Sequence, residues 1–450
     1  MKKLFIILTA ALVSVSIMAE DHVMEATKRQ EPRTKSQESR AESQEQQTLT
    51  LSIQEAQDFA VKQNRSLKNA SLAVQQAYAQ RWQTIAAMLP QLDGSFSKTY
   101  VMDSTWQEQT ISFGPTTISM SPMTYSVTAS WGLNGQAIVA AYLGTLAIEM
   151  QKLSLEESED ALRASVKTSY ASVLVLEDIV NLMDSSLVNL ERLAEMTQRS
   201  VDVGAAEQTS ADQIMVRVNT IRDNINSQKR NVELARASLK VLLDVPVNTE
   251  MELTTPLDDL LSAETVLQLL SENYNKENNL SYQLLQKNVK LAEANVHMAG
   301  WAYGPTLSAY YQYSQQNPKT LMGAPHTVGV SVSMPLWSSG KRAAGVVEKK
   351  IALESARNTL EETTDNLDIQ YQQLRYTLQN AYESYLTQKA NLDVTRRVFE
   401  STTNKFNYGA SSNLELVNAS NDVISAQSSY VQAVLTLVQA NVELEKFLNN

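Results

Sequence analysis

The chain has 450 residues, a formal net charge of −11 and no cysteine. A sequence without cysteine excludes disulfides, thiolate metal sites and a cysteine nucleophile. An acidic chain without a Lys/Arg-rich run is a poor match for a nucleic-acid partner. Only 13 glycines and 10 prolines interrupt this length, which favours long helices with few turns.

The N-terminal residues have the pattern of a secretory signal peptide. Lys2 and Lys3 precede an apolar stretch that runs to Met18, and Ala19 is the expected cleavage position. The apolar stretch is shorter than the roughly 20 residues that cross a bilayer as a helix, so an N-terminal membrane anchor is the weaker alternative. Residues 20–48 have almost no apolar side chains, which predicts a flexible polar leader. No later apolar run predicts a membrane-spanning helix.

A helix and then two strands are predicted next. From Leu51 to Met88 apolar residues recur at helical spacing, and Pro90 ends this helix. Strands are expected around 95–102 and over 125–133, where odd positions are apolar and even positions are small or polar. This alternation predicts one apolar and one polar face. Such a sheet fits either a soluble sandwich or a membrane barrel whose apolar face meets lipid.

The longest pattern runs from Ala137 to Val203 without a proline. Mostly apolar residues recur there every seven positions in two series, which predicts a long helix in a left-handed coiled coil. The first series is Val166, Val173, Val180, Leu187, Ala194 and Val201, and the second is Leu162, Ser169, Leu176, Met183, Leu190 and Thr197. A shorter helix over 210–243 is expected to return along part of the long one.

The second half of the chain repeats the first. Gly340 follows Gly135 by 205 positions, and Gly409 follows Gly204 by the same number. A unit of this length is too large for a solenoid repeat, which indicates a duplicated half-protein. The second copy is expected to hold a helix over 265–302 with a break near 273–279, strands over 307–314 and 328–334, a second heptad helix and a return over 413–448.

The expected segments of the whole chain follow from these patterns. They are a signal peptide (1–19), the polar leader (20–48), a first repeat (49–244), a link marked by Pro246 and Pro256 (245–260) and a second repeat (261–450). Each repeat offers one strand hairpin, so the two repeats supply four strands. About eight strands are the minimum for a closed barrel, and lipid does not tolerate open sheet edges. A membrane barrel therefore requires several chains.

Three motifs carry a family resemblance. They are LPQL at 89–92, VSVSMPLWSSG at 330–340 and YGASSNLELVNA at 408–419. With the duplicated order of elements around them, the chain resembles the TolC-type outer-membrane efflux protein family over essentially its whole mature length.

The resemblance implies a fold that is mainly α with a small β part. Long antiparallel coiled-coil helices would form a periplasmic tube, and each chain of a homotrimer would give four strands to one twelve-strand barrel in the outer membrane. It also implies a passive exit duct without catalysis or cofactors, in contact with outer-membrane lipid. A periplasmic adaptor and an inner-membrane pump, proton-driven or ATP-driven, would drive export of drugs, metals or other toxic small molecules. The alternatives are a duct for ATP-driven protein or peptide secretion and, less favoured, a periplasmic coiled-coil scaffold.

The resemblance also places two kinds of site at the glycine tips. The adaptor-docking tips would be Gly204, Ala205, Ala206 and Glu207, with Gly409, Ala410, Ser411 and Ser412. The pore constriction would hold Phe406, Ser411, Glu415 and Asn418, with Ser210 and Asp212 as weaker candidates.

Each of these sites also has a simpler explanation. Three copies of Glu415 would make an acidic ring that attracts cations, whereas the family often has a second acidic residue at the position of Asn418. The departure at Asn418 puts tight cation blockade in doubt. The local alternatives are that the glycines only end helices and that Glu415 is a solvated surface charge.

Other motifs in the sequence do not support an enzyme. Gly340-Lys341-Arg342 lacks the Ser or Thr of a phosphate loop, and Pro335 stands where its first glycine should be. The histidines, His22, His297 and His326, are too far apart in sequence to suggest a metal site. No nucleophile elbow is present, so we expect neither catalysis nor a metal.

Overall fold

The computed structural model describes residues 49–102, 107, 110–113, 116–119, 123–204, 207–260, 262–317 and 325–449. The predicted signal peptide and leader lie outside these residues, as does His22. Two compact units can be separated: the first takes Leu72–Lys152 and Leu284–Glu361, and the second takes Leu153–Gln283 and Glu362–Asn450 with residues 49–71. Each unit therefore draws on both halves of the sequence.

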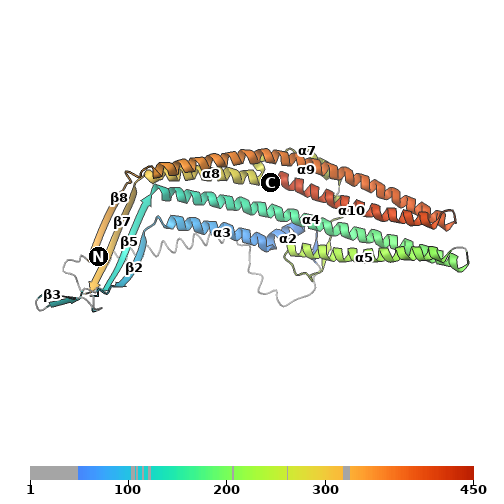
Figure 1. Cartoon of the computed structure of the whole chain (residues 1–450), viewed down its shortest axis with the longest axis horizontal. Helices are drawn as coiled ribbons and strands as arrows, with labels where there is room; N and C mark the ends of the chain where they lie inside the picture. Colours follow the sequence, from blue (N-terminus) through green and yellow to red (C-terminus); the bar gives the residue numbers. More distant parts are fainter. Residues whose placement is uncertain are drawn as a thin grey trace. The chain divides into compact units, whose positions relative to one another are not determined.

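The first unit contains a four-stranded antiparallel sheet (Figure 1). Its strands are β2 (Gln91–Lys98), β5 (Met123–Asn134), β7 (Thr306–Asn317) and β8 (His326–Ser333), in the order β2-β5-β7-β8. One predicted hairpin from each repeat thus joins into a single sheet. Two further strands, which the sequence analysis missed, pair only with each other: β3 (Thr110–Phe113) and β4 (Thr116–Ser119).

The strand register brings the apolar positions of all four strands onto one face. Val127 lies opposite Gly94 on β2 and Tyr313 on β7, and Tyr311 lies opposite Val328 on β8. Because directly opposed residues share a face, the alternation predicted for β5 and β8 extends across the sheet. The opposite face carries hydroxyls and amides, with Ser95 bonded to Ser126 and Ser308 bonded to Ser331.

The predicted continuous helix over 51–88 is wrong. The chain forms β1 (Leu49–Leu51), α2 (Ile53–Gln63) and α3 (Arg65–Ala86), with a break at the buried Asn64. The Asn64 side-chain oxygen accepts the N–H groups of Ser66 and Leu67 at 2.8 and 3.2 Å, and its amide donates to the Leu242 carbonyl at 2.9 Å. These bonds start a new helix at this point, as an N-cap residue does.

The break predicted in the second repeat is confirmed. Here α7 (Ala263–Ser271) and the short 3₁₀ helix η1 (Lys276–Asn278) precede α8 (Leu280–Gly300), and η2 (Trp301–Tyr303) leads to β7. Buried Asn279 accepts the Tyr282 N–H at 3.1 Å through its side-chain oxygen. An asparagine therefore caps the corresponding helix in both repeats.

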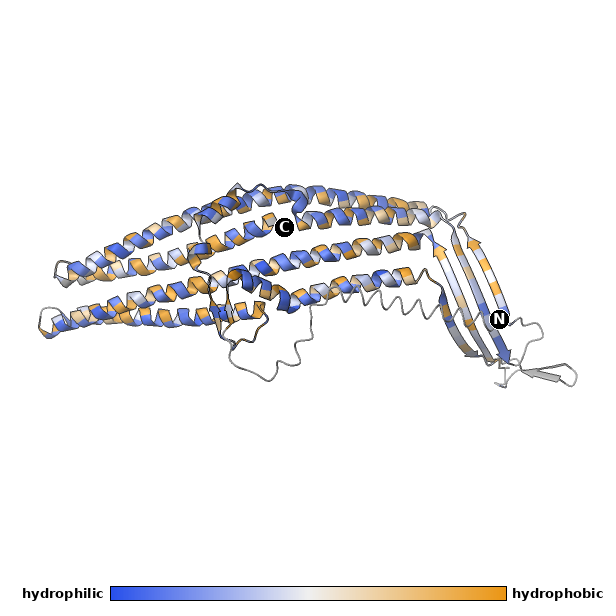
Figure 2. Ribbon diagram, turned by 180° about the vertical axis from the view of Figure 1, so that it is seen from behind, coloured by the Kyte–Doolittle hydropathy of each residue, from blue (hydrophilic) through white to orange (hydrophobic). Residues whose placement is uncertain are grey.

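Four long helices build the second unit, and two of them begin in the first unit. They are α4 (Gly135–Asp202), α5 (Gln208–Leu242), α9 (Lys341–Asn407) and α10 (Asn413–Asn449). Their apolar stripes, visible as alternating colours in Figure 2, enclose the main core. Heptad residues such as Val166, Val173 and Leu378 are fully buried, which confirms the predicted coiled-coil seams.

Polar and aromatic contacts give the order of these helices within the second unit. Arg222 on α5 bonds to Glu191 on α4 at 2.8 Å, and Gln427 on α10 bonds to Ser186 on α4. Tyr430, also on α10, packs against Tyr385 of α9 with ring centroids 6.0 Å apart. Helices α5 and α9 are thus the outer members of the row α5-α4-α10-α9.

The link between the repeats is more ordered than predicted. It contains β6 (Met251–Leu253), which pairs in parallel with β1, and the short helix α6 (Leu257–Leu260). The Tyr170 hydroxyl donates to the Leu51 carbonyl at 2.9 Å and accepts the Thr255 N–H at 3.0 Å. Throughout the described part of the chain, no helix is long and apolar enough to cross a membrane.

Candidate functional site: the glycine-tipped hairpins

The hairpin between α9 and α10 turns at Gly409. Its φ of +71° lies in the left-handed region that favours glycine. The Gly409 N–H donates to the Phe406 carbonyl at 2.9 Å, and the Ala410 N–H donates to the Lys405 carbonyl at 2.8 Å. These two bonds form a Schellman motif, which satisfies carbonyls at the end of α9.

Helix α10 begins with a capping box. The Ser412 hydroxyl accepts the Glu415 N–H, and the Glu415 carboxylate accepts the Ser412 N–H, both at 3.2 Å. The Ser411 hydroxyl also donates to the Glu415 carboxylate. Glu415 therefore closes the start of its own helix in the pattern S-x-x-E. That pattern is present in the sequence at 412–415 and could have predicted this role.

Hydrogen bonding also changes the acidity of Glu415. The Ser411 hydroxyl, the Ser412 N–H and, to a smaller extent, the nearby Lys405 ammonium lower the pKa of this carboxyl below its usual range. The side chain is exposed. The second tip therefore presents a carboxylate that stays ionised at neutral pH.

The remaining predicted gate residues of the second repeat divide between core and surface. Phe406 is half-buried and packs against the main core. Asn418 is exposed and lies three residues after Glu415, so both side chains share one face of α10. The adjacent residues Leu416 and Ala419 are buried in the core. The structure therefore places Glu415 and Asn418, but not Phe406, on an accessible surface.

The hairpin between α4 and α5 has the same glycine and a different cap. Gly204 has φ +75°, and its N–H donates to the Val201 carbonyl at 2.9 Å. The predicted docking residues Ala205 and Ala206 lie outside the described residues. Glu207 precedes α5, and its side chain caps no backbone N–H of the first turn; its carboxylate accepts the Thr209 hydroxyl at 3.2 Å instead.

The first-repeat gate candidates lie near the start of α5. Ser210 is half-buried, and Asp212 is exposed and accepts the Gln208 side-chain amide at 2.9 Å. Both tips thus present an exposed acidic side chain near the start of the returning helix, although only the second is held by a capping box.

A match to a protein-family model identifies the family of this chain. The family model described as outer membrane efflux protein matches residues 58–244 and 275–450. The chain belongs to the outer membrane efflux protein family. Its two matched segments follow the two repeats, and its place is therefore the outer membrane, extending into the periplasm.

Curated relatives of this efflux protein are distant. The chain is 23% identical over 403 residues to "Toxin and drug export protein A" of Aggregatibacter actinomycetemcomitans, which covers 85% of this chain and 82% of that protein. It is also 23% identical over 332 residues to "Pyoverdine export outer membrane protein OpmQ" of Pseudomonas aeruginosa, covering 71% of this chain and 67% of the relative.

Solved channel structures share the fold. The chain superposes on CusC with a TM-score of 0.72 at 16% identity, covering 88% of this chain and 92% of that one. VceC, an outer membrane protein of Vibrio cholerae, gives a TM-score of 0.69 at 14% identity, with 88% and 96% covered. The predicted class, mainly helical with a small sheet and the TolC-type arrangement, is confirmed.

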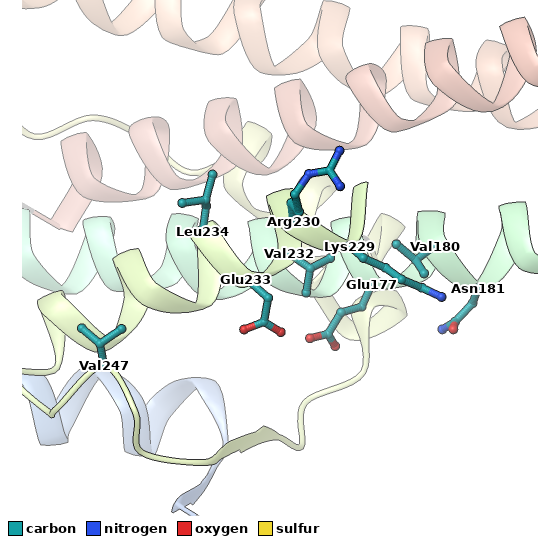
Figure 3. Close-up of a pocket in the computed structure, with 9 residues that line it drawn as sticks. All are labelled: Glu177, Val180, Asn181, Lys229, Arg230, Val232, Glu233, Leu234 and Val247. Carbon is teal, nitrogen blue, oxygen red and sulfur yellow. The ribbon is translucent and has the colours of Figure 1, made fainter. Parts of the chain in front are cut away.

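A groove also opens beside the helices of the second unit of this efflux protein (Figure 3). It has a volume of about 930 Å³ and is lined by α4, α5 and the link, with Val232, Leu234 and Val247 among its apolar members. Its charged members include Glu177, which is paired with Arg236 at 2.6 Å. The groove brings together no nucleophile and base, so among the described residues the tips remain the candidate functional surfaces.

Proposed function

We propose that three copies of this chain form a passive outer-membrane exit duct for small molecules. A periplasmic adaptor would dock on the tips, and an inner-membrane pump would supply the energy. Membership of the efflux family supports export. The passive duct, its trimeric state and its partners are proposed in addition.

The observation that carries the trimer is the four-stranded sheet with one apolar face. Within the described residues, β2 and β8 each have a strand partner on one side only, so both edges of the sheet are open. Unpaired backbone groups are not tolerated in lipid, and four strands are too few to close on themselves. Pairing β8 of one chain with β2 of the next removes every edge, and three chains give a barrel of about twelve strands.

The helices of the second unit support the same assembly. The outer helix α5 exposes Val216 and Val241, and the outer helix α9 exposes Ile369 and Tyr376. Contact between α5 of one chain and α9 of the next would cover both stripes, together with the groove at Leu234. Such a head-to-tail contact closes into a ring when the rotation between copies fits.

We further propose that both tips serve adaptor docking and the closed end of the duct. Tyr408 and Leu414 are exposed apolar residues beside Gly409, which is unusual for a hairpin end in water and fits a protein partner. Glu415 and Asn418 would line the constriction, with three ionised Glu415 carboxylates favouring cations. The repeats at 49–244 and 261–450, joined by 245–260, remain our proposed domain boundaries.

The cargo is assigned by analogy. The names of relatives cite toxins and drugs, pyoverdine, antibiotics and toluene, which supports small molecules. Protein or peptide secretion through an ATP-driven pump is the alternative, and identification of the pump separates the two.

The test is to extract the full-length protein from membranes and measure its mass and conductance. The proposal expects release only with detergent, a mass three times that of one chain, and pores in planar bilayers without pump or nucleotide. Release without detergent would support a periplasmic scaffold instead, and a monomer with no conductance would contradict the duct.

A further inference from the structure

A second surface groove lies in the first unit, where β8 passes into α9. Its volume is about 500 Å³, and its walls come from α8, the start of α4, the turn after β8 and the first turns of α9. Its described lining contains the cationic side chains of Lys341, Arg342 and Lys349 and no carboxylate. The groove therefore has the charge of an anion-binding site.

Arg342 is held in a fixed position at this groove. Its Nε–H donates to the Ser338 hydroxyl at 2.9 Å and its Nη1 donates to the Pro335 carbonyl at 2.7 Å. The guanidinium also lies 5.1 Å from the centroid of the Tyr303 ring. A guanidinium has five N–H donors, so three remain available after these two bonds. In the described part of the chain no carboxylate pairs with Arg342.

The two lysine side chains of the groove differ in whether they already form an ion pair. Lys349 is already paired with Glu348 at 2.8 Å. Lys341 is exposed and, among the described residues, has no ion pair. Ser339 and Gly340 have φ values of 48° and 80°, and this left-handed turn places Lys341 and Arg342 at the first turn of α9. The free N–H groups and dipole at that helix start add to the attraction for an anion.

Large apolar side chains surround the same cations. Leu336 and Trp337 are 89% and 86% exposed. Leu336 continues the series of apolar even-numbered positions that begins with Val328 and passes through Val332 and Met334. The cationic groove is therefore continuous with the apolar face of the sheet. Tryptophan beside a lipid-facing strand is typical of the boundary between the membrane and water.

We propose that this groove binds the phosphate of an anionic glycerophospholipid on the periplasmic side of the outer membrane. Lys341 and the free donors of Arg342 would hold the phosphate, since arginine forks match phosphate oxygens. The acyl chains would lie along Leu336 and the valines of β8. A water-soluble anion would use the cations but not the exposed Trp337 and Leu336, and these apolar neighbours are why we assign a lipid. The lipid assignment rests on the proposed barrel, in which the apolar face of β8 meets lipid, and not on adaptor docking or conduction.

Native mass spectrometry of the full-length protein tests this site. The protein is released into a mild detergent and mixed with equal amounts of phosphatidylglycerol and phosphatidylcholine, and retained lipids are counted per chain. We expect preferential retention of phosphatidylglycerol. Lys341→Gln and Arg342→Gln should each weaken that retention about tenfold, the usual effect of losing one charge-assisted contact.

Lys350→Gln is the matched control, because Lys350 is an exposed lysine on the same helix outside the groove. It should leave retention unchanged. Arg342→Gln also removes hydrogen bonds within the turn and could impair assembly. In that case Lys341→Gln is the deciding variant, because the Lys341 side chain makes no bond in the described structure.

Three results of the mass spectrometry would overturn the proposal. They are equal retention of both lipids, equal loss in Lys350→Gln, and displacement of the lipid by inorganic phosphate alone, which would indicate a simple anion site. Capture of a protein chain by a photo-crosslinker at Trp337 in cells, with no lipid retained, would also refute it.

Discussion

The ring of Trp301 occupies the space that a side chain at Gly135 would need. A Cβ built on Gly135 would lie 2.1 Å from the ring, whereas one on Gly340 meets nothing within 4 Å. The two glycines hold equivalent positions in the repeats. Gly135 is required for close approach of Trp301, and Gly340 is required for its φ of +80°.

Alanine at either glycine should therefore destabilise the protein for different reasons. Gly135→Ala forces Trp301 to move and should lower the free energy of unfolding by about 1–3 kcal/mol. Gly340→Ala should cost about 1–2 kcal/mol through backbone strain. Gly345→Ala is the control, because no atom lies within 4 Å of its Cβ position and alanine favours helix. Thermal unfolding midpoints check all three; a drop in Gly345→Ala as large as in Gly135→Ala would contradict this account.

Substitutions of Glu415 can separate its two roles. Glu415→Gln removes the charge but keeps an oxygen for the capping box, whereas Glu415→Ala removes both. If the acidic ring exists, both variants lower cation selectivity in planar bilayers. Only Glu415→Ala should speed hydrogen exchange severalfold in the first turn of α10. Unchanged selectivity in both variants would leave Glu415 with the capping role alone.

The lowered pKa of Glu415 also predicts a pH dependence at the second tip. A carboxyl whose pKa is lower in the folded state stabilises the fold while it is ionised. That stabilisation is complete above the ordinary pKa of about 4.3 and is lost as the pH falls through the lower folded value. Protection of the amides in the first turn of α10, measured relative to the intrinsic exchange rate at each pH, should therefore fall in this acidic range. Glu415→Gln should not show this dependence, and an equal dependence in that variant would point to another group.

Asn64 should matter more than a typical helix asparagine. Asn64→Ala leaves two N–H groups and the Leu242 carbonyl without their bonds at a buried position, and should cost about 1–3 kcal/mol. Asn231→Ala, at an exposed position within α5, should be neutral or slightly stabilising. Chemical denaturation checks the difference, and equal stability of the two variants would show that the break does not depend on Asn64.

The tips can be tested for docking because the chain has no natural cysteine. A photo-crosslinker on Tyr408→Cys should capture an adaptor in living cells, since Tyr408 is exposed and takes no part in the capping box. The control is Val188→Cys, which is exposed on α4 away from the tip. Capture at both positions alike would mean that the adaptor does not select the tip.

Regular patterns in the sequence predicted the large elements well. Heptads predicted α4 and α9 because every seventh residue contributes to one continuous seam. Alternation in β5 and β8 predicted the faces of the sheet because side chains on a strand point to alternate faces, so a strand covered on one side shows an apolar residue at every second position. Both patterns involve residues that are close in sequence, and both can therefore be recognised without knowledge of the fold.

Features that depend on distant partners were missed. The three-residue strands β1 and β6 pair across some 200 positions and are too short to show a period. The break at Asn64 is fixed by its bond to Leu242, whose sequence neighbourhood gives no hint of it. The cap at Glu415 is encoded locally as S-x-x-E, whereas the family resemblance predicted a pore role for this residue.

The polar face of the sheet has a consequence for cargo. Its described residues on β5, β7 and β8 are serine, threonine, glutamine, asparagine, tyrosine and glycine, and Asp93 on β2 is a rare charge among them. Water against such a wall meets dipoles that can turn to favour either sign of ion. In the proposed duct, the exit through the membrane would be indifferent to the charge of what leaves. Any preference for cations over anions would then have to arise before the cargo reaches the strands.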